Sequence, residues 1–190
     1  MDVAFTNLLE KATNKKMNNF EQRLTGGHPN SLGNTVEVVE QVLDQNELFD
    51  ELFNCYFSDD EVVRLRTSSA IKRVCKAKKE LFFPYIDRFF TEIAVIDQAS
   101  TQWTLAQLFD LLKRDMSDFQ LKKAIEIMQT NIEHHKDWIV LNTTMGVLGN
   151  WSKRIPELKL WLVPHLERLA SDPRKSVSSK ASKTLALLAI

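Results

Sequence analysis

The chain has 190 residues, with 25 Lys and Arg against 25 Asp and Glu, and 44% of its residues are hydrophobic. This length can bury one sizeable core, while five glycines and five prolines exclude collagen-like and low-complexity chains and argue against a many-stranded β protein. Two cysteines are too few for a disulfide scaffold or a four-cysteine zinc site, and neither a membrane span nor a secretory leader is expected, so we predict a cytoplasmic protein without a membrane contact.

The N-terminal region, residues 1–34, does not share the pattern of the rest of the chain. A short helix is indicated there by Phe5, Leu8 and Leu9, and the turn-rich stretch 25–34 predicts a loop. An amphipathic helix over 35–45 follows and is expected to cap the first of a series of repeats. We therefore predict an N-terminal helix and loop over 1–34 and one repeat domain over 35–190.

Four stretches beginning at Val63, Thr101, Val140 and Val177 align without gaps, at spacings of 38, 39 and 37 residues. Apolar or small residues recur at offsets 0, 4, 7, 8 and 11 from each of these anchors. Such offsets form a single stripe on a helix. The sequence therefore predicts four similar helices that bury the same face, a signature of repeat architectures.

A further amphipathic helix is expected before each of these four, over 46–57, 84–95, 119–132 and 156–169. Prolines 84, 156 and 173 are predicted in first helical turns, where a missing N–H costs nothing. Short turns that contain aspartate separate the two helices of each pair, and these aspartates are expected to accept hydrogen bonds from the free N–H groups of the second helix. Helix pairs repeating every 37–39 residues are typical of an α-solenoid.

The unit ELFDELFNCYFSDDEVVRLRTSSAIKRV, from Glu47, resembles a HEAT repeat, and IDQASTQWTLAQLF is similar to the second unit of small uncharacterised bacterial HEAT-repeat proteins. The likeness covers residues 32–190. It implies an all-α, right-handed α-solenoid of about four HEAT-like helix pairs, related to armadillo folds, whose second helices line the concave side. The arginine that follows each anchor in the family is kept only as Arg64, which puts the usual Asp–Arg ladder between repeats in doubt.

Offsets 3, 6, 10 and 13 of the second helices are expected to form an exposed strip beside the buried stripe. Seven of these 16 positions are basic and none is acidic. From this strip and its neighbours we predict a partner-binding basic ridge, formed by Arg66, Arg73, Lys76, Trp103, Gln107, Arg114, Asn150, Lys153, Lys180 and Lys183. The alternative is an ordinary solvated face, because cations favour helix C-termini in any case.

Charge is sorted between the two kinds of helix. The segments that contain the second helices, 59–79, 97–114, 136–154 and 172–190, hold 16 basic and 7 acidic residues. The rest of the chain holds 9 basic and 18 acidic residues. An arrangement of this kind can steer an acidic partner although the net charge is zero.

Residues for chemistry are sparse. The His134–His135 pair is best interpreted as part of a polar turn, and Cys55 and Cys75 as buried apolar residues, so we predict no metal, no cofactor and no small-molecule substrate. Trp151 and Trp161 lie on apolar faces and are expected to pack. Trp103 and Trp138 are left open between packing and an exposed contact.

Two functions remain open. The first is a non-catalytic scaffold that binds an acidic protein or peptide along the basic ridge. The second is nucleic-acid binding, remotely like the alkylpurine DNA glycosylases built from HEAT-like repeats, which use an aspartate with aromatic residues. The ingredients for the second function would be Asp137, Trp138, Trp151 and Arg154, with Asp110 as a further carboxylate. A neutral chain is atypical of nucleic-acid binders.

Overall fold

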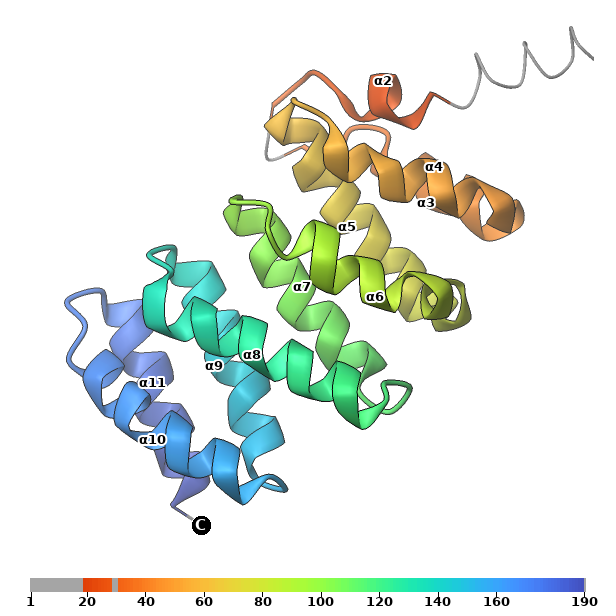
Figure 1. The fold of residues 1–190 in the computed structure, drawn as a ribbon. Coiled ribbons are helices and arrows are strands. Elements are labelled where there is room, and N and C mark those ends of the chain that lie inside the picture. The colour runs from red at the N-terminus through yellow and green to blue at the C-terminus, as the bar shows by residue number, and fades with distance from the viewer. Residues whose placement is uncertain (1–18, 29–30, 190) are drawn as a thin grey trace, which may run out of the picture. The chain divides into compact units, whose positions relative to one another are not determined.

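The computed structural model describes residues 19–28 and 31–189, and every regular element within them is helical, with no strand. The α-helices are α2 (Phe20–Leu24), α3 (Thr35–Asp44), α4 (Phe49–Asn54), α5 (Glu61–Ala77), α6 (Ile86–Arg88), α7 (Ala99–Leu112), α8 (Asp118–His134), α9 (Trp138–Ser152), α10 (Pro156–Ala170) and α11 (Lys175–Leu188). Three tighter 3₁₀ turns are η1 (Asn46–Leu48), η2 (Cys55–Phe57) and η3 (Lys79–Tyr85), and η4 (Phe89–Ile93) is a wider π turn. The all-α class predicted from the sequence is confirmed (Figure 1).

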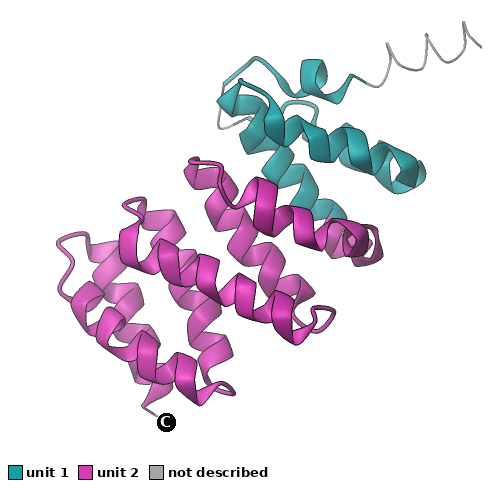
Figure 2. Cartoon of the chain, in the orientation of Figure 1, with its two compact units in different colours: residues 1–74 teal, residues 75–190 magenta. Residues whose placement is uncertain are grey.

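The chain forms two compact units, residues 1–74 and residues 75–190, which Figure 2 shows in two colours. The division falls within α5, so the last turn of this helix belongs to the second unit. The boundary predicted after residue 34 stays a prediction. The N-terminal helix expected from Phe5, Leu8 and Leu9 lies outside the described residues.

In the first unit, α2 packs against α4, and α3 leads into α4 through η1. The helix predicted over 35–45 is observed as α3, whose core face buries Val38 and Val42. The backbone N–H of Phe20, at the start of α2, donates to Glu51 Oε1 of α4 at 3.0 Å. An otherwise unsatisfied donor of a helix start thereby ties the two helices together.

The second unit is built of helices in two layers. Helices α7, α9 and α11 contact one another in turn, and α8 contacts both η4 and α9, while α10 contacts α9 and α11. In Figure 1, α8 and α10 lie toward the viewer, with α9 and α11 behind them. Hereafter α7, α9 and α11 are called the second helices of this unit, and α6 with η4, α8 and α10 are called its first helices.

The stripe predicted from the sequence is the buried face of α5, α7, α9 and α11. All four anchors, Val63, Thr101, Val140 and Val177, have no exposed surface, and the residues at offsets 4, 7 and 11 from each anchor are buried as well. At offset 8, Ile71 and Leu148 are fully buried but Leu185 is half-buried. The predicted equivalence therefore fails at this last position, which lies in the C-terminal helix, where no further helix of the described chain follows.

The first helices differ from the prediction at two places. The stretch 46–57 consists of η1, α4 and η2 rather than one α-helix, and 84–95 begins inside η3 and continues through α6 into the π turn η4. Pro84 therefore lies within a 3₁₀ turn. Pro156 does open α10 as predicted, whereas Pro173 lies before α11, which begins at Lys175.

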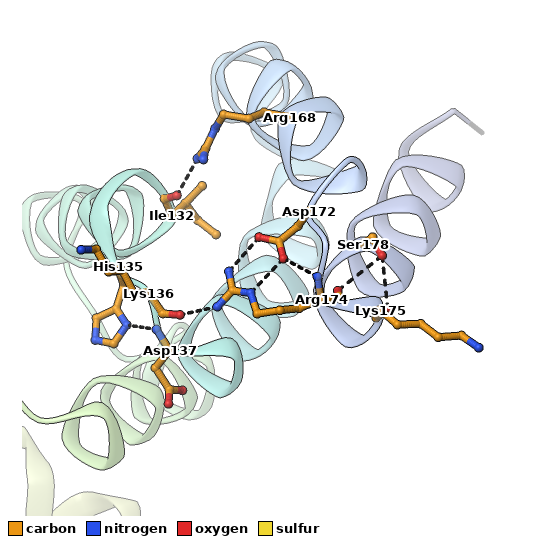
Figure 3. Close-up of polar contacts among 9 residues, drawn as sticks. All are labelled: Ile132, His135, Lys136, Asp137, Arg168, Asp172, Arg174, Lys175 and Ser178. Carbon is orange, nitrogen blue, oxygen red and sulfur yellow. Dashed lines mark hydrogen bonds and ion pairs between the residues drawn. The ribbon is translucent and has the colours of Figure 1, made fainter.

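Arginine side chains tie neighbouring turns of the second unit together (Figure 3). Arg174 pairs with Asp172 through bonds of 2.7 and 2.8 Å, and its Nη1 also donates to the backbone carbonyl of Lys136 in the preceding turn. Arg168 near the end of α10 donates to the carbonyl of Ile132 in α8 at 2.9 Å. Both arginines thus donate to backbone carbonyls of the preceding helix pair. Neither of them is the residue that directly follows an anchor, where the HEAT-like pattern has its arginine.

Candidate functional site

The ten residues of the predicted basic ridge have different environments. The exposed members are Arg73, Lys76, Arg114, Asn150, Lys153 and Lys183, and the half-buried members are Trp103, Gln107 and Lys180. Arg66 is only 3% exposed. Arg66 and Arg73 belong to the first unit and the other eight to the second.

Arg66 is a correction to the prediction, because its guanidinium is a structural centre of the first unit. Its nitrogens donate to the carbonyls of five residues in the 24–31 segment, at distances from 2.6 to 3.3 Å: Leu24, Thr25, Gly26, His28 and Ser31. Nη1 faces the carbonyls of Leu24, Thr25 and Gly26, while Nη2 and Nε donate to those of His28 and Ser31, so the planar guanidinium reaches the whole cluster. Arg66 therefore cannot offer its charge to a partner without dismantling this loop.

The same loop explains Gly33. Its backbone has φ +51°, in the left-handed region that glycine adopts easily, and a Cβ at this position would lie 2.9 Å from Arg66 Cζ. The loop thus packs directly on the flat face of the guanidinium. The sequence pattern identified 25–34 as a loop but carried no signal that it would cover a residue of α5.

Seven cations of the second unit line two hollows. The first, here called the tryptophan groove, is about 540 Å³ and lies where α7 and α9 end. It is lined by Asp110, Lys113, Arg114, Leu121, Asn150, Trp151, Lys153, Arg154 and Ile155. Four of these side chains are cationic and one is anionic, so the groove is positive overall.

Trp151 is the fixed centre of the tryptophan groove. It is 1% exposed, and its Nε1–H donates to Asp110 Oδ1 at 2.7 Å. The Lys113 ammonium lies 4.6 Å from the centroid of the indole ring, a cation–π distance. Burial lowers the pKa of Lys113, and the Asp110 carboxylate acts in the opposite direction. The predicted packing role of Trp151 is confirmed, and its ring has no free face for stacking.

The second hollow, here called the lysine hollow, is about 480 Å³ and lies between α9 and α11. It is lined by Asn142, Lys175, Ser176, Ser179, Lys180 and Lys183. No acidic side chain lines it. Lys180 and Lys183 were predicted ridge residues, while Lys175 and Asn142 were missed because they lie outside the offsets chosen for the ridge.

The ingredients considered for a glycosylase-like site do not come together. Asp137 accepts hydrogen bonds from the N–H groups of Ile139 and Val140, so it caps the start of α9. Trp138 is 49% exposed at that same end. Trp151 lies 13 residues further along the helix, or about 20 Å at 1.5 Å per residue. Only Asp110, Trp151 and Arg154 share a groove.

A third hollow, of about 440 Å³, lies between η4, the following turn and α8. Phe90, Val95 and Ile127 are among its apolar lining, and the buried amide pair of Gln102 and Asn131, 3.1 Å apart, forms part of its wall. His134 and His135 also border it, and His135 Nδ1 accepts the N–H of Asp137 at 3.0 Å. The two histidines thus lie at a polar turn, as predicted. No group of three metal-ligating side chains occurs in the described ranges.

No family model, curated protein or solved structure matches this chain. Within 19–28 and 31–189, no helix combines the length and the apolar character needed to span a bilayer.

Proposed function

We propose that the chain is a non-catalytic interaction module that binds an acidic protein or peptide through the second-helix side of its second unit. The finer architecture belongs to the same proposal: a right-handed, HEAT-like α-solenoid of about four helix pairs, working in the cytoplasm. The binding surface differs from the ridge predicted from the sequence. Arg66 and Arg73, which belong to the first unit, are withdrawn from it, and Lys113, Arg154 and Lys175 are added.

The observation that carries the proposal is a surplus of uncommitted cations. Six cations that form no ion pair with any residue in the described part of the chain lie close together: Arg114, Lys153, Arg154, Lys175, Lys180 and Lys183. All six line the tryptophan groove or the lysine hollow. Other unpaired cations, such as Lys122, Lys136 and Lys159, line neither hollow. Positive charge that is not used within the fold is available to steer and hold an acidic partner.

The distribution of acidic side chains supports the same side. Within α7, α9 and α11 the only acidic residue is Asp110, and it accepts the Trp151 indole N–H. The first helices of this unit carry seven acidic residues: Asp87, Glu92, Asp118, Glu126, Glu133, Glu157 and Glu167. The first helices also carry five basic residues, so their net charge is −2, whereas α7, α9 and α11 hold three lysines against Asp110, a net charge of +2. Of the two layers, the second helices therefore favour an acidic partner.

A matched pair of charge reversals tests the proposal. The test variant changes Arg114, Lys153 and Lys183 to Glu, and the control changes Lys122, Lys136 and Lys159 to Glu. All six residues are exposed, and each variant alters the net charge by the same amount. Binding of a poly-glutamate peptide at low salt should be lost in the test variant and kept in the control. Equal losses would mean that only net charge matters and that no particular surface binds.

Nucleic-acid binding is the second candidate. It is favoured by the positive tryptophan groove, in which the Asp110 carboxylate and the Trp151 indole lie together with Lys113 and Arg154. Against it, single-strand binders stack bases on open aromatic faces, and Trp151 is buried. A duplex or oligonucleotide would show log K falling by about 0.7–0.9 per decade of salt for each phosphate neutralised. Because an acidic peptide also loses affinity as salt rises, the two candidates are separated by comparing an oligonucleotide with a poly-glutamate peptide of equal charge at the same low salt.

A further inference from the structure

The tryptophan groove and the lysine hollow both lie along one face of α9. Asn142 lines the lysine hollow, and Asn150 and Lys153 line the tryptophan groove. Together with Gly146 these residues follow one another at spacings of four, four and three, which keeps them on a single face of a helix. From Asn142 to Lys153 the face is about 16 Å long at 1.5 Å per residue.

Gly146 makes the path between the two hollows open and positive. A Cβ built at this position would lie 3.0 Å from Lys180 Nζ and 3.3 Å from its Cε. The Lys180 side chain therefore extends from α11 across α9 at the point where α9 has no side chain. A single added Cβ would shift the flexible end of Lys180 by only a few tenths of an ångström, whereas a side chain as large as leucine would compete with the ammonium for the path.

The path presents charge and amide groups but no open aromatic ring. Between the cations at its two ends lie Gly146, over which the Lys180 ammonium reaches from the lysine hollow, and the Asn150 amide. The indole of Trp151 is covered by Lys113. Such a surface favours carboxylates and a polar main chain over stacked bases. In an extended polypeptide, which rises about 3.3 Å per residue, 16 Å corresponds to about five residues.

We propose that this path binds an extended polypeptide segment with two acidic clusters whose centres are about five residues apart. One cluster contacts Lys175, Lys180 and Lys183, and the other contacts Arg114, Lys153 and Arg154. The inference rests on the proposed function, since it names the partner of the same surface. Neither end alone needs to bind tightly, because joining two weak contacts raises the local concentration of the second.

Three peptides carrying an uncharged fluorophore test the spacing by anisotropy at low salt. The first has two Glu pairs separated by three neutral residues, the second has four consecutive Glu in the same total length, and the third has one Glu pair. The spaced peptide should bind about tenfold more tightly than the single pair, from several exposed ion pairs acting together. It should also bind better than the consecutive peptide of equal charge.

Two half-site variants and a path variant give the structural control. One half-site variant changes Lys180 and Lys183 to Glu, and the other changes Arg114 and Lys153 to Glu. Each should lower the affinity for the spaced peptide to that for the single-pair peptide. Gly146→Leu should do the same while sparing the single pair. Lys122 and Lys159 to Glu should leave all three affinities unchanged. If Gly146→Leu lowers the melting temperature strongly, the two half-site variants at exposed or half-buried positions decide the question.

The outcomes separate this inference from the proposed function. If the consecutive peptide binds as tightly as the spaced one, and the half-site variants still weaken both, the two-cluster inference is wrong while the acidic-partner proposal stands. If no peptide binds, both are wrong. If an oligothymidylate of equal charge binds more tightly than the spaced peptide, the partner is a nucleic acid and the peptide assignment is overturned.

Discussion

Replacement of Arg66 by alanine is the sharpest test of the first unit. The change removes five hydrogen bonds from a charged donor that is 3% exposed. Hydrogen bonds to charged groups contribute about 1.5–3 kcal/mol each, but the desolvation of a buried guanidinium offsets much of their sum. The buried Leu24 carbonyl would lose this donor, at about 1–3 kcal/mol, whereas the four remaining carbonyls can be hydrated once the loop loosens. We expect the free energy of unfolding to fall by about 2–3 kcal/mol.

Urea unfolding followed by circular dichroism measures this loss, with Arg73→Ala as the control. Arg73 lies on the same helix and is exposed, so its removal should change the free energy of unfolding by less than about 0.5 kcal/mol. Limited proteolysis should cut Arg66→Ala within 25–28 much faster than the parent. Arg66→Lys should show an intermediate rate of cleavage, because a single ammonium cannot reach all the carbonyls that surround the planar guanidinium. Equal urea midpoints for the two alanine variants would refute this account of the loop.

Three further expectations concern stability and reactivity. Leu148→Ala should cost about 2–4 kcal/mol by urea unfolding, and Leu185→Ala clearly less, because Leu185 is half-exposed; equal costs would contradict the observed burial. The hydrogen bond from Arg174 lowers the pKa of Asp172 to about 2. The stabilising contribution of the ionised Asp172 is therefore present above pH 4 and is lost as the pH falls toward 2. Asp172→Asn should remove that part of the pH dependence of the melting temperature. Burial raises the pKa of each cysteine thiol to about 12, so neither should react with a thiol reagent at pH 8 until urea unfolds the chain, and rapid labelling of the native protein would contradict this.

The buried stripe of α5, α7, α9 and α11 could be predicted because it depends only on local periodicity. Every anchor from Val63 to Val177 is buried, since residues spaced by three or four positions share one face whatever the neighbours are. The first helices could not be predicted to the same detail. The π turn η4 places Phe89 in a stack on Phe82, with ring centroids 5.9 Å apart, and such packing between residues of irregular turns leaves no periodic trace.

The exposed ridge was predicted less well, for a geometric reason. A helix in a stack is covered on both flanks as well as on its core face, so its exposed arc is narrower than that of a lone amphipathic helix. At offset 3, Thr104 is buried like Arg66, and Lys180 is half-buried across α9. Only offsets 10 and 13 are exposed wherever they are described, as at Asn150 and Lys153.

The cations that were missed did leave a sequence signal. Lys113 and Arg114 follow α7, and Lys153 and Arg154 follow α9, so a basic pair recurs at nearly the same place after two second helices. Cations at helix C-termini are commonly explained by the helix dipole, and that explanation concealed the recurrence. What the sequence could not show is that both pairs turn toward the same groove around Trp151.

The placement of Asp110 explains how a carboxylate can lie in this groove without cancelling its charge. The carboxylate accepts the Trp151 N–H and thereby fixes the indole, whose face in turn supports the Lys113 ammonium. The negative charge of Asp110 therefore acts on Lys113. Lys153 and Arg154 form no ion pair among the described residues, so their positive charge is not neutralised. Asp110→Asn should accordingly keep the indole contact and strengthen binding of an acidic peptide slightly, whereas Asp110→Leu should free the indole and weaken it. If both substitutions strengthened binding equally, Asp110 would act only as a repelling charge and would have no role in positioning the groove.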